Sequence, residues 1–374
     1  MLTRFDESLL HQVPLTFAES ATSDHRFYDR VFLTVADPAG GAELAVGMGV
    51  YKNMNVIDGF AALALPDRQV NVRVSRPLRP EFDTSVGGLR YEVIEPLRRL
   101  RLALEPGHGL AFVLQWTATF PVIEEGAWWG TANRVNGRVA IDVRRYEQVG
   151  RVSGWIEADG RRIDVRDWFG GRDHSWGVRG LVGGYEPDNG GRLIDGRGML
   201  LTWFLFDCGE FCGVIARTED DAGRQCGLEG EIVHGDGRPR QRIVEAAVRP
   251  RFPAGSRYYD ACDIDFSTAD GRSWALRAEP IGPTVICKGG GYDGGWSDGR
   301  GLGFHRGERV ETDLYLPTDD PGTARVLSGA TISHNQREAA ARVQVNGMPG
   351  FGDCTLIAMG ELPRYGLGSR PVQL

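Results

Sequence analysis

The stretch that decides the fold class is Arg151–Trp168, which reads RVSGWIEADGRRIDVRDW. Two strand-like runs in it flank Asp159-Gly160, a dipeptide that tolerates the positive φ angles of a tight hairpin turn. The pattern predicts an antiparallel hairpin in which Arg151–Ile156 pairs with Arg162–Trp168.

The same turn chemistry recurs along the chain. Cys262–Ala278 repeats the turn Ala-Asp-Gly-Arg and predicts that Cys262–Phe266 pairs with Ser273–Ala278. Asp-Gly occurs seven times and Asn-Gly three times, and glycine supplies 52 of the 374 residues. Strand-like runs lie between these turns, and no strand alternates with a long helix. We therefore expect an all-β protein.

The number of strands indicates two domains. At ~150 residues per domain the chain is long enough for two, and roughly twenty short strands are too many for one small barrel. The glycine-rich stretch Gly177–Gly198 is the natural boundary. We predict two lipocalin-like antiparallel β-barrels, an N-terminal one over residues 1–180 and a C-terminal one over residues 181–374.

Composition argues against several classes of protein. The net charge of −7 is spread along the chain, which disfavours nucleic-acid binding. The N-terminus carries Asp6 and Glu7 where a signal peptide needs an apolar run, and no apolar run approaches the ~20 residues of a spanning helix. We expect a cytoplasmic protein without stable membrane insertion.

Cysteine and glycine patterns bear on cofactors. The six cysteines form no C-x-x-C pair, so we expect free thiols, mostly buried, and no metal site. Neither a phosphate-binding nor a dinucleotide-binding glycine motif is present in a convincing context. The sequence therefore predicts no cofactor.

The segment Gly170–Gly177, GGRDHSWG, is the densest in chemistry-bearing side chains. If it is extended, His174 and Trp176 project to one face and Asp173 to the other. An imidazole beside an indole suits a proton donor next to a ring that stabilises a cation. The alternative is a structural crossing between domains, in which Arg172 and Asp173 form an ion pair.

A second candidate patch follows Gly47. Tyr51, Asn53 and Asn55 alternate, so on a strand they would line one face and bind a hydroxylated substrate. Lys52 is one of only two lysines, and it would serve as a general base or a Schiff-base amine if burial lowered its pKa. The alternative is a surface lysine at a polar strand end.

Four motifs resemble one enzyme group. Asp173-His174-x-Trp176, followed by Trp203-Phe204-x-Phe206-Asp207, resembles the carotenoid 1,2-hydratase (hydroxyneurosporene synthase) group. Phe27-Tyr28-Asp29-Arg30 and Tyr146-Glu147-Gln148-x-Gly150-Arg151-Val152 resemble its uncharacterised bacterial relatives. The resemblance implies a pair of lipocalin-like barrels and no obligatory redox cofactor. Relatives include hydratases of isoprenoid double bonds and fungal cyclases that close decalin rings, so the fold alone does not fix the activity.

The resemblance also implies roles for residues. His174 and Trp176 match the His-x-Trp of the hydratases, and Asp207 lies near an acidic position there, although Cys208 interrupts the acidic-glycine pattern. A hydratase would need a carboxylic acid that an apolar pocket keeps protonated. The alternative for Asp207 is a carboxylate that caps the turn before Gly209.

Three kinds of function stay open. The first is a cofactor-independent lyase or hydratase that acts by acid–base chemistry on an apolar or aromatic small molecule, with hydration or dehydration of an isoprenoid-like alkene ahead of retro-aldol C–C cleavage of a phenolic substrate. The second is a non-catalytic carrier of a hydrophobic ligand, and the third is a structural or partner-binding protein; a homodimer is left open. Predicted catalytic residues are His174, Asp207, Tyr51 and Lys52, and predicted substrate contacts are Trp176, Trp203, Asn53, Asn55, Arg172 and Asp173.

Overall fold

Strands make up most of the structure. The computed structural model describes residues 4–7, 9, 11–79, 83–125, 134–135, 138–139, 141–184, 198–290, 292, 300–334 and 336–368. The structure is 62% strand and 3% helical, and it contains a closed antiparallel barrel. The predicted all-β, lipocalin-like fold class is confirmed.

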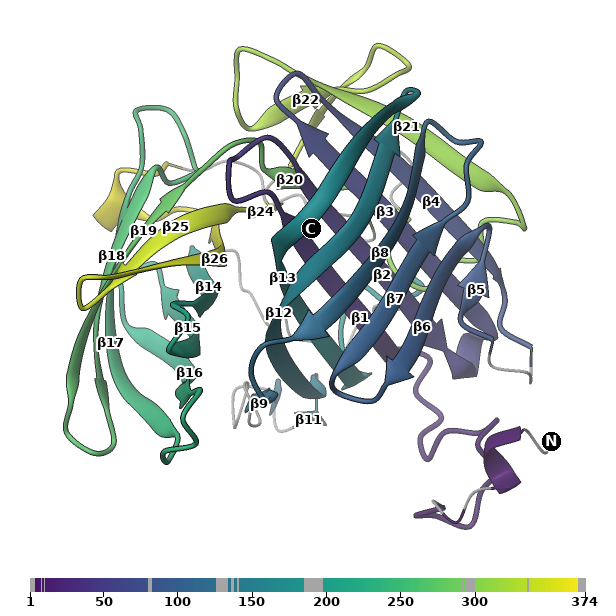
Figure 1. Cartoon of the computed structure of the whole chain (residues 1–374), viewed down its shortest axis with the longest axis horizontal. Coiled ribbons are helices and arrows are strands. Elements are labelled where there is room, and N and C mark those ends of the chain that lie inside the picture. Colours follow the sequence, from purple (N-terminus) through teal and green to yellow (C-terminus); the bar gives the residue numbers. More distant parts are fainter. Residues whose placement is uncertain are drawn as a thin grey trace.

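The first sheet has fourteen strands (Figure 1). They are β1 (Phe27–Ala36), β2 (Glu43–Tyr51), β3 (Val56–Leu65), β4 (Arg68–Pro77), β5 (Ser85–Val86), β6 (Leu89–Glu95), β7 (Arg99–Leu104), β8 (Leu110–Ala118), β9 (Ile123–Glu125), β12 (Asp142–Ala158), β13 (Arg161–Val178), β21 (Val310–Pro317), β22 (Thr323–Arg325) and β23 (Thr331–Ser333). Their order is β23-β22-β21-β4-β3-β2-β1-β13-β12-β8-β7-β6-β5, and β9 pairs with β12.

The second sheet closes into a barrel whose eight strands lie in chain order. Its strands are β14 (Met199–Asp207), β15 (Phe211–Asp220), β16 (Gln225–His234), β17 (Gln241–Arg251), β18 (Ala261–Thr268), β19 (Ser273–Pro280), β25 (Ala340–Val345) and β26 (Met348–Met359). Two short pairs join β10 (Arg134–Val135) to β11 (Arg138–Val139) and β20 (Val285–Ile286) to β24 (Arg337–Glu338). Single 3₁₀ turns are η1 (Arg4–Glu7), η2 (Lys52–Met54) and η4 (Pro363–Tyr365).

Both predicted hairpins are confirmed. β12 and β13 pair antiparallel with Ile156 opposite Ile163, and β18 pairs with β19 with Phe266 opposite Trp274. In the first hairpin Asp159 and Gly160 adopt φ angles of 49° and 74°, the left-handed values that the Asp-Gly turn permits.

Strands from the C-terminal half extend the N-terminal sheet. β21 pairs antiparallel with β4, with Val310 opposite Val74, and β22 and β23 follow β21 outward. The light-green strands of Figure 1 lie beside the blue ones for this reason. The domain boundary between residues 180 and 181 stays a prediction, and residues 185–197 of the glycine-rich stretch lie outside the described residues.

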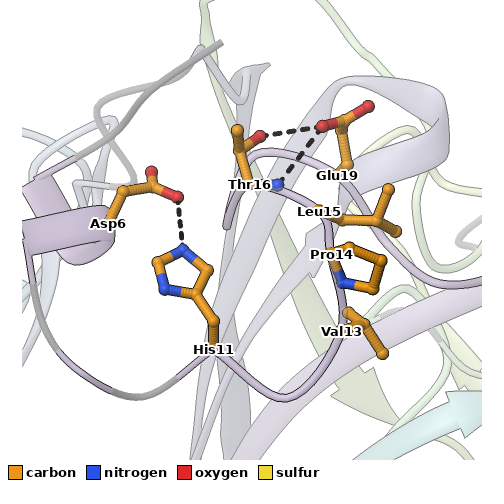
Figure 2. Close-up of a pocket in the computed structure, with 7 residues that line it drawn as sticks. All are labelled: Asp6, His11, Val13, Pro14, Leu15, Thr16 and Glu19. Carbon is orange, nitrogen blue, oxygen red and sulfur yellow. Dashed lines mark hydrogen bonds and ion pairs between the residues drawn. The ribbon is translucent and has the colours of Figure 1, made fainter.

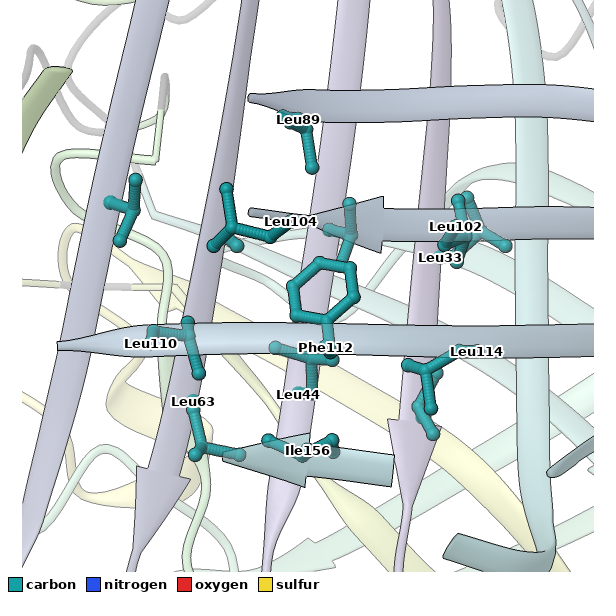
Figure 3. Close-up of a cluster of buried hydrophobic side chains, with 14 of the residues drawn as sticks. Leu33, Leu44, Leu63, Leu89, Leu102, Leu104, Leu110, Phe112, Leu114 and Ile156 are labelled. Atoms are coloured by element: carbon teal, nitrogen blue, oxygen red, sulfur yellow. The ribbon is translucent and has the colours of Figure 1, made fainter. Parts of the chain in front are cut away.

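The first sheet curls around a hydrophobic core. Arg76 on β4 donates a hydrogen bond from Nε to the Ser85 carbonyl of β5 at 2.9 Å. β4 and β5 are far apart in the strand order, so this bond joins two distant parts of the sheet. Side chains from β1 to β4, from β6 to β8, and from β12 and β13 meet inside. Figure 3 shows Phe112 among leucines of this core. Burial of this apolar surface stabilises the curl, at roughly 25 cal/mol per Å².

The two sheets pack through the outer faces of neighbouring strands. Phe169 of β13 and Val149 of β12 contact Leu205 of β14 and Val214 of β15 in a separate apolar cluster. This contact covers the outer face of β12 and β13. It explains why consecutive residues in the middle of each strand, which point to opposite faces, are all buried.

Three carboxyl groups are buried near the same junction. Glu43 of β2, Glu338 of β24 and Asp353 of β26 are each at most 3% exposed. None of the three forms an ion pair with a described residue. Burial, followed by mutual repulsion, raises the pKa of Glu43 and of Asp353 well above the ordinary value.

Two further predictions can be compared with the described residues. All six cysteines are free and only Cys226 is exposed, as expected. Within the described part of the chain no helix is both long and apolar enough to cross a membrane.

Candidate active site

β13 places alternate side chains of the Gly170–Gly177 segment on opposite faces. Arg172 and His174 stand opposite Leu33 and Val31 of β1, which belong to the inner core. Asp173 points the other way, to within 3.8 Å of the Arg145 guanidinium. The expected alternation is confirmed, and the Arg172–Asp173 ion pair of the structural alternative is wrong, because the two side chains lie on opposite faces.

His174 links a carboxylate to a phenol. Its Nε2 lies 2.7 Å from Oδ1 of Asp29 at the start of β1, and its Nδ1 lies 3.0 Å from the Tyr146 hydroxyl on β12. An ionised carboxylate only accepts hydrogen bonds, so we assign the proton to Nε2 and let Nδ1 accept from Tyr146. The arrangement is a proton relay of three side chains.

Arg172 lies at the buried end of the site. Its guanidinium lies 4.7 Å from the Trp116 ring and 5.2 Å from the Tyr146 ring, and its Nε donates to Gln148 Oε1 at 3.1 Å. Gly170 makes room for the indole, since a Cβ there would lie 2.6 Å from Trp116 Cδ1. The first glycine of the sequence motif is therefore explained by a close approach of backbone and indole.

Arg172 is 3% exposed and forms no ion pair with any described carboxylate. A buried guanidinium with neutral and aromatic neighbours keeps its charge available to a second partner. The chemistry of such a partner is a carboxylate, phenolate or enolate oxygen.

Two phenols beside Arg172 stay protonated at neutral pH. Burial raises the pKa of Tyr146, against the opposing effect of the neighbouring Arg172 charge. Burial likewise raises the pKa of Tyr91 to about 12, again against Arg172. Because the opposing charge is already present, a proton that leaves either phenol would leave behind a phenolate that Arg172 stabilises.

One end of this cluster is open to solvent. The side chains of His174 and Asp29 are 27% and 49% exposed, and Trp176 is 38% exposed. The Trp176 ring centroid lies 5.4 Å from that of His174 and 6.4 Å from that of Tyr146. An apolar or aromatic molecule bound at this end would contact the Trp176 indole beside the exposed imidazole of His174.

The Tyr51–Asn55 patch does not join this cluster. β2 ends at Tyr51 and η2 occupies Lys52–Met54, so the prediction that Tyr51, Asn53 and Asn55 share one strand face is wrong. The physical reason is that the chain leaves the extended path after Tyr51 and turns through η2, which Asn55 closes with a left-handed φ of 52°.

Each residue of that patch has a structural contact. Tyr51 is fully buried on the outer face, where it accepts from Arg30 and donates to Asp58, both at 3.1 Å. Asn53 binds Ser20 and two backbone carbonyls of the N-terminal segment, and Asn55 accepts from the Arg79 N–H at 3.2 Å.

Lys52 lies nearer the open end. Its Nζ donates to the Phe17 carbonyl at 2.8 Å. Burial lowers its pKa, and the charges of Asp29 and Asp6 oppose this effect. Lys52 is therefore close enough to Asp29 to feel its charge, but its amine already holds the N-terminal segment.

Trp203 and Asp207 lie between the two sheets. Trp203 donates from Nε1 to Glu125 at 3.2 Å and to Glu147 at 3.3 Å. Asp207 lies 2.9 Å from Arg151 Nη1 and accepts from the Gly209 N–H at 2.7 Å. The turn-capping alternative therefore fits the contacts of Asp207, and a catalytic role for Asp207 stays a prediction.

The site contains residues that sequence reasoning did not select. Asp29 and Tyr146 lie inside the two segments, Phe27–Arg30 and Tyr146–Val152, that resemble bacterial relatives. The resemblance therefore pointed to these segments but assigned neither residue a function. Tyr91 gave no signal, because only the curl of the sheet brings β6 to Arg172.

A separate surface hollow lies in the N-terminal segment. Its volume is about 390 Å³. Figure 2 shows His11 bonded to Asp6, and Glu19 bonded to Thr16, around it. None of the predicted site residues lines this hollow.

The described residues contain no group of three or more His, Cys, Asp or Glu side chains arranged to hold a metal ion. The expectation of a cofactor-free protein stays a prediction.

The chain was compared with protein families and with known proteins. A family model described as "Family of unknown function (DUF8625)" matches residues 2–323. The chain belongs to this family. No curated protein matches it.

Solved structures show the fold of this family member. Protein NE1406 of Nitrosomonas europaea, described provisionally as an AttH, is 13% identical, with a TM-score of 0.54 over 91% of this chain and 94% of its own. Kievitone hydratase from Nectria haematococca is 12% identical, with a TM-score of 0.40 over 91% of each chain. CghA with Sch210972 is 9% identical, with a TM-score of 0.47 over 90% of this chain and 89% of its own. At these identities the likeness to NE1406 supports the fold alone.

Proposed function

We propose that the protein is a lyase that uses acid–base chemistry at His174, on an aromatic small molecule that carries an oxygen able to become an anion. The observation that carries the proposal is the relay Asp29–His174–Tyr146, with the unpaired charge of Arg172 beside it. Both a hydro-lyase and a carbon–carbon lyase need a group that moves a proton and a positive charge that stabilises an anion.

Each group has a role in such a reaction. With neutral His174, Nδ1 accepts the Tyr146 proton, so the phenolate oxygen acts as a base. With protonated His174, Nδ1 donates to Tyr146, whose own proton is then free to reach a leaving group. Asp29 holds the imidazole in one tautomer. Arg172 stabilises the enolate or phenolate that forms between the two proton transfers.

Elimination of water illustrates how the proton and electron transfers balance in such a reaction. The base removes the proton next to a carbonyl, the electron pair forms the enolate, and hydroxide leaves with a proton from the acid as water. Hydration runs the same steps backward. In a retro-aldol cleavage the base removes the proton of the β-hydroxyl, and its oxygen forms a carbonyl as the C–C bond breaks. The electron pair of that bond forms the enolate or phenolate, which takes a proton back from the acid.

Hydration of an isoprenoid-like alkene is the second candidate. The exposed indole of Trp176 beside His174 favours it, since an aromatic face stabilises a carbocation. That reaction needs a strong acid, and the proton donors described on this face are a phenol and an imidazole. An oxygen-bearing substrate therefore fits the site better.

The test is turnover of a panel of aryl enones, aryl β-hydroxy ketones and isoprenoid alcohols. Mass spectrometry in H₂¹⁸O detects a gain or loss of water and the origin of the oxygen, and EDTA treatment should leave turnover intact. His174→Ala and Tyr146→Phe should each lower kcat by about 10²–10⁴-fold. His108→Ala, in the turn between β7 and β8, is the matched control and should have no effect.

Two results would overturn the proposal. Turnover that survives both His174→Ala and Tyr146→Phe in folded protein would place the chemistry elsewhere. Ligands that bind tightly and are recovered with unchanged mass across the panel would identify a carrier.

A further inference from the structure

Gln148 of β12 is a buried side chain that uses every hydrogen-bonding position of its amide group. It is 1% exposed. Its Oε1 accepts from Nε of Arg172 at 3.1 Å and from Nη2 of the same guanidinium. Its Nε2 donates to the Leu97 carbonyl at 3.0 Å and to the Phe120 carbonyl at 2.8 Å. Both lone pairs of the oxygen and both N–H groups are therefore occupied.

The two carbonyls determine which side chain fits at this position. A backbone carbonyl only accepts hydrogen bonds, so the Leu97 and Phe120 carbonyls need an N–H donor. Glutamate has the shape of glutamine, but it would turn a carboxylate oxygen toward both carbonyls. The contacts therefore select an amide at Gln148, with its nitrogen toward the carbonyls and its oxygen toward Arg172. As a result, the hydrogen-bond partner of Arg172 is a neutral oxygen.

A neutral partner leaves the charge of Arg172 for a ligand, because this buried guanidinium forms no ion pair with a described carboxylate. Its other polar neighbours are the hydroxyls of Tyr91 and Tyr146, which are hydrogen-bonded to it. A guanidinium only donates, so each hydroxyl accepts from Arg172 and directs its own proton elsewhere. Tyr146 is already bonded to His174. An anion at Arg172 would therefore accept a second hydrogen bond from Tyr91.

Arg172 lies behind His174 on the path from solvent. The two side chains are two residues apart on one face of β13, a separation of about 6.6 Å along the strand. His174 and Trp176 are partly exposed, whereas Arg172 is buried. A ligand from solvent would therefore pass the Trp176 indole and reach Arg172 with its anionic group. At neutral pH a carboxyl group is a full anion and a phenol is not, so the group that this position favours is a carboxylate.

We propose that the site takes its substrate as an aromatic carboxylate, and that Gln148 determines this specificity by keeping the charge of Arg172 available. In this scheme Arg172 binds the carboxylate, and Gln148 is a positioning residue that acts through it. The role of the carboxylate as substrate rests on the proposed function, whereas its binding can be measured without turnover.

Benzoate and benzamide are the matched probes, because they share a shape and differ in charge. We expect benzoate to bind the unaltered protein at least about tenfold more tightly at about pH 8, where it is fully ionised. Isothermal titration calorimetry measures both dissociation constants. Benzoate that binds no better than benzamide, or binding of neither, would overturn the proposal. A preference for benzoate in a protein that turns over no aromatic carboxylate would support the binding site and refute the lyase.

Gln148→Glu tests the role of the amide. At this pH the new carboxylate would pair with Arg172, so we expect Kd for benzoate to rise about tenfold or more and Kd for benzamide to change little. Damage to the fold would instead weaken the binding of both probes alike. The control is Gln115→Glu, on the exposed side of β8, which should keep the preference for benzoate. A folded Gln148→Glu variant that keeps this preference would contradict the role of Gln148; if that variant does not fold, the preference of the unaltered protein decides.

Discussion

Glu43 offers the sharpest test of the buried carboxyl cluster. Its Oε2 accepts a hydrogen bond from the Ala340 N–H at 3.3 Å, and burial raises its pKa well above the ordinary value. The unfolded chain releases this proton above about pH 4.5, where the folded chain still holds it. The folded state then binds more protons than the unfolded state, so stability falls as pH rises.

The magnitude follows from the number of retained protons. Each one lowers the free energy of unfolding by about 1.4 kcal/mol per pH unit. Between pH 5.5 and 7.5, Glu43 therefore lowers stability at up to this rate for as long as the folded chain holds its proton, which corresponds to about 2 °C in Tm per pH unit. Ordinary exposed carboxyls titrate below this window.

The substitution Glu43→Gln keeps the acceptor for Ala340 and removes the titration. We expect the variant to be more stable than the unaltered protein at pH 7.5, with a smaller difference at pH 5.5. Calorimetry across this range measures both. Glu92→Gln, on the exposed side of β6, is the control and should leave the slope unchanged. A variant that is equally destabilised at both pH values would refute the reasoning.

Four further outcomes are expected. Gly170→Ala should lower stability by about 1–3 kcal/mol, because the new methyl would lie 2.6 Å from Trp116, whereas Gly235→Ala, with nothing closer than 3.5 Å, should not; thermal melts compare them. Asp207→Asn should lower Tm through loss of the Arg151 pair and leave turnover unchanged, so lost turnover in a folded variant would restore Asp207 to the chemistry. Lys52→Met should make the N-terminal segment more sensitive to limited proteolysis, because the bond to the Phe17 carbonyl is lost, with little change in Tm of the core. Tyr91→Phe should raise KM more than it lowers kcat if Tyr91 orients substrate beside Arg172, and kinetics at two substrate concentrations would separate the effects.

The fold class could be predicted because its determinants are local. Asp159-Gly160 sets a turn whatever the rest of the chain does, and the period of two in Gly170–Gly177 assigns faces without knowledge of the partners. The pairing of β21 with β4 could not be predicted in this way, since it depends on two segments far apart in the chain.

The candidate site was predicted in part for the same reason. His174, Trp176 and Arg172 share a face of one strand, and that face follows from spacing. Asp29 and Tyr146 join them across β1 and β12, and their contacts depend on register. Asn53 and Asn55 were misplaced because the alternation was extended past Tyr51, where the strand ends and a 3₁₀ turn begins.

The insertion of β21 beside β4 also sets an order of events during synthesis. The edge of β4 that Val310 covers stays unpaired while the ribosome makes the barrel strands β14 to β19. An exposed edge strand is a template for pairing with other chains. The N-terminal sheet therefore cannot pair this edge before residues 310–317 have been made, and until then the edge is open to pairing with other chains.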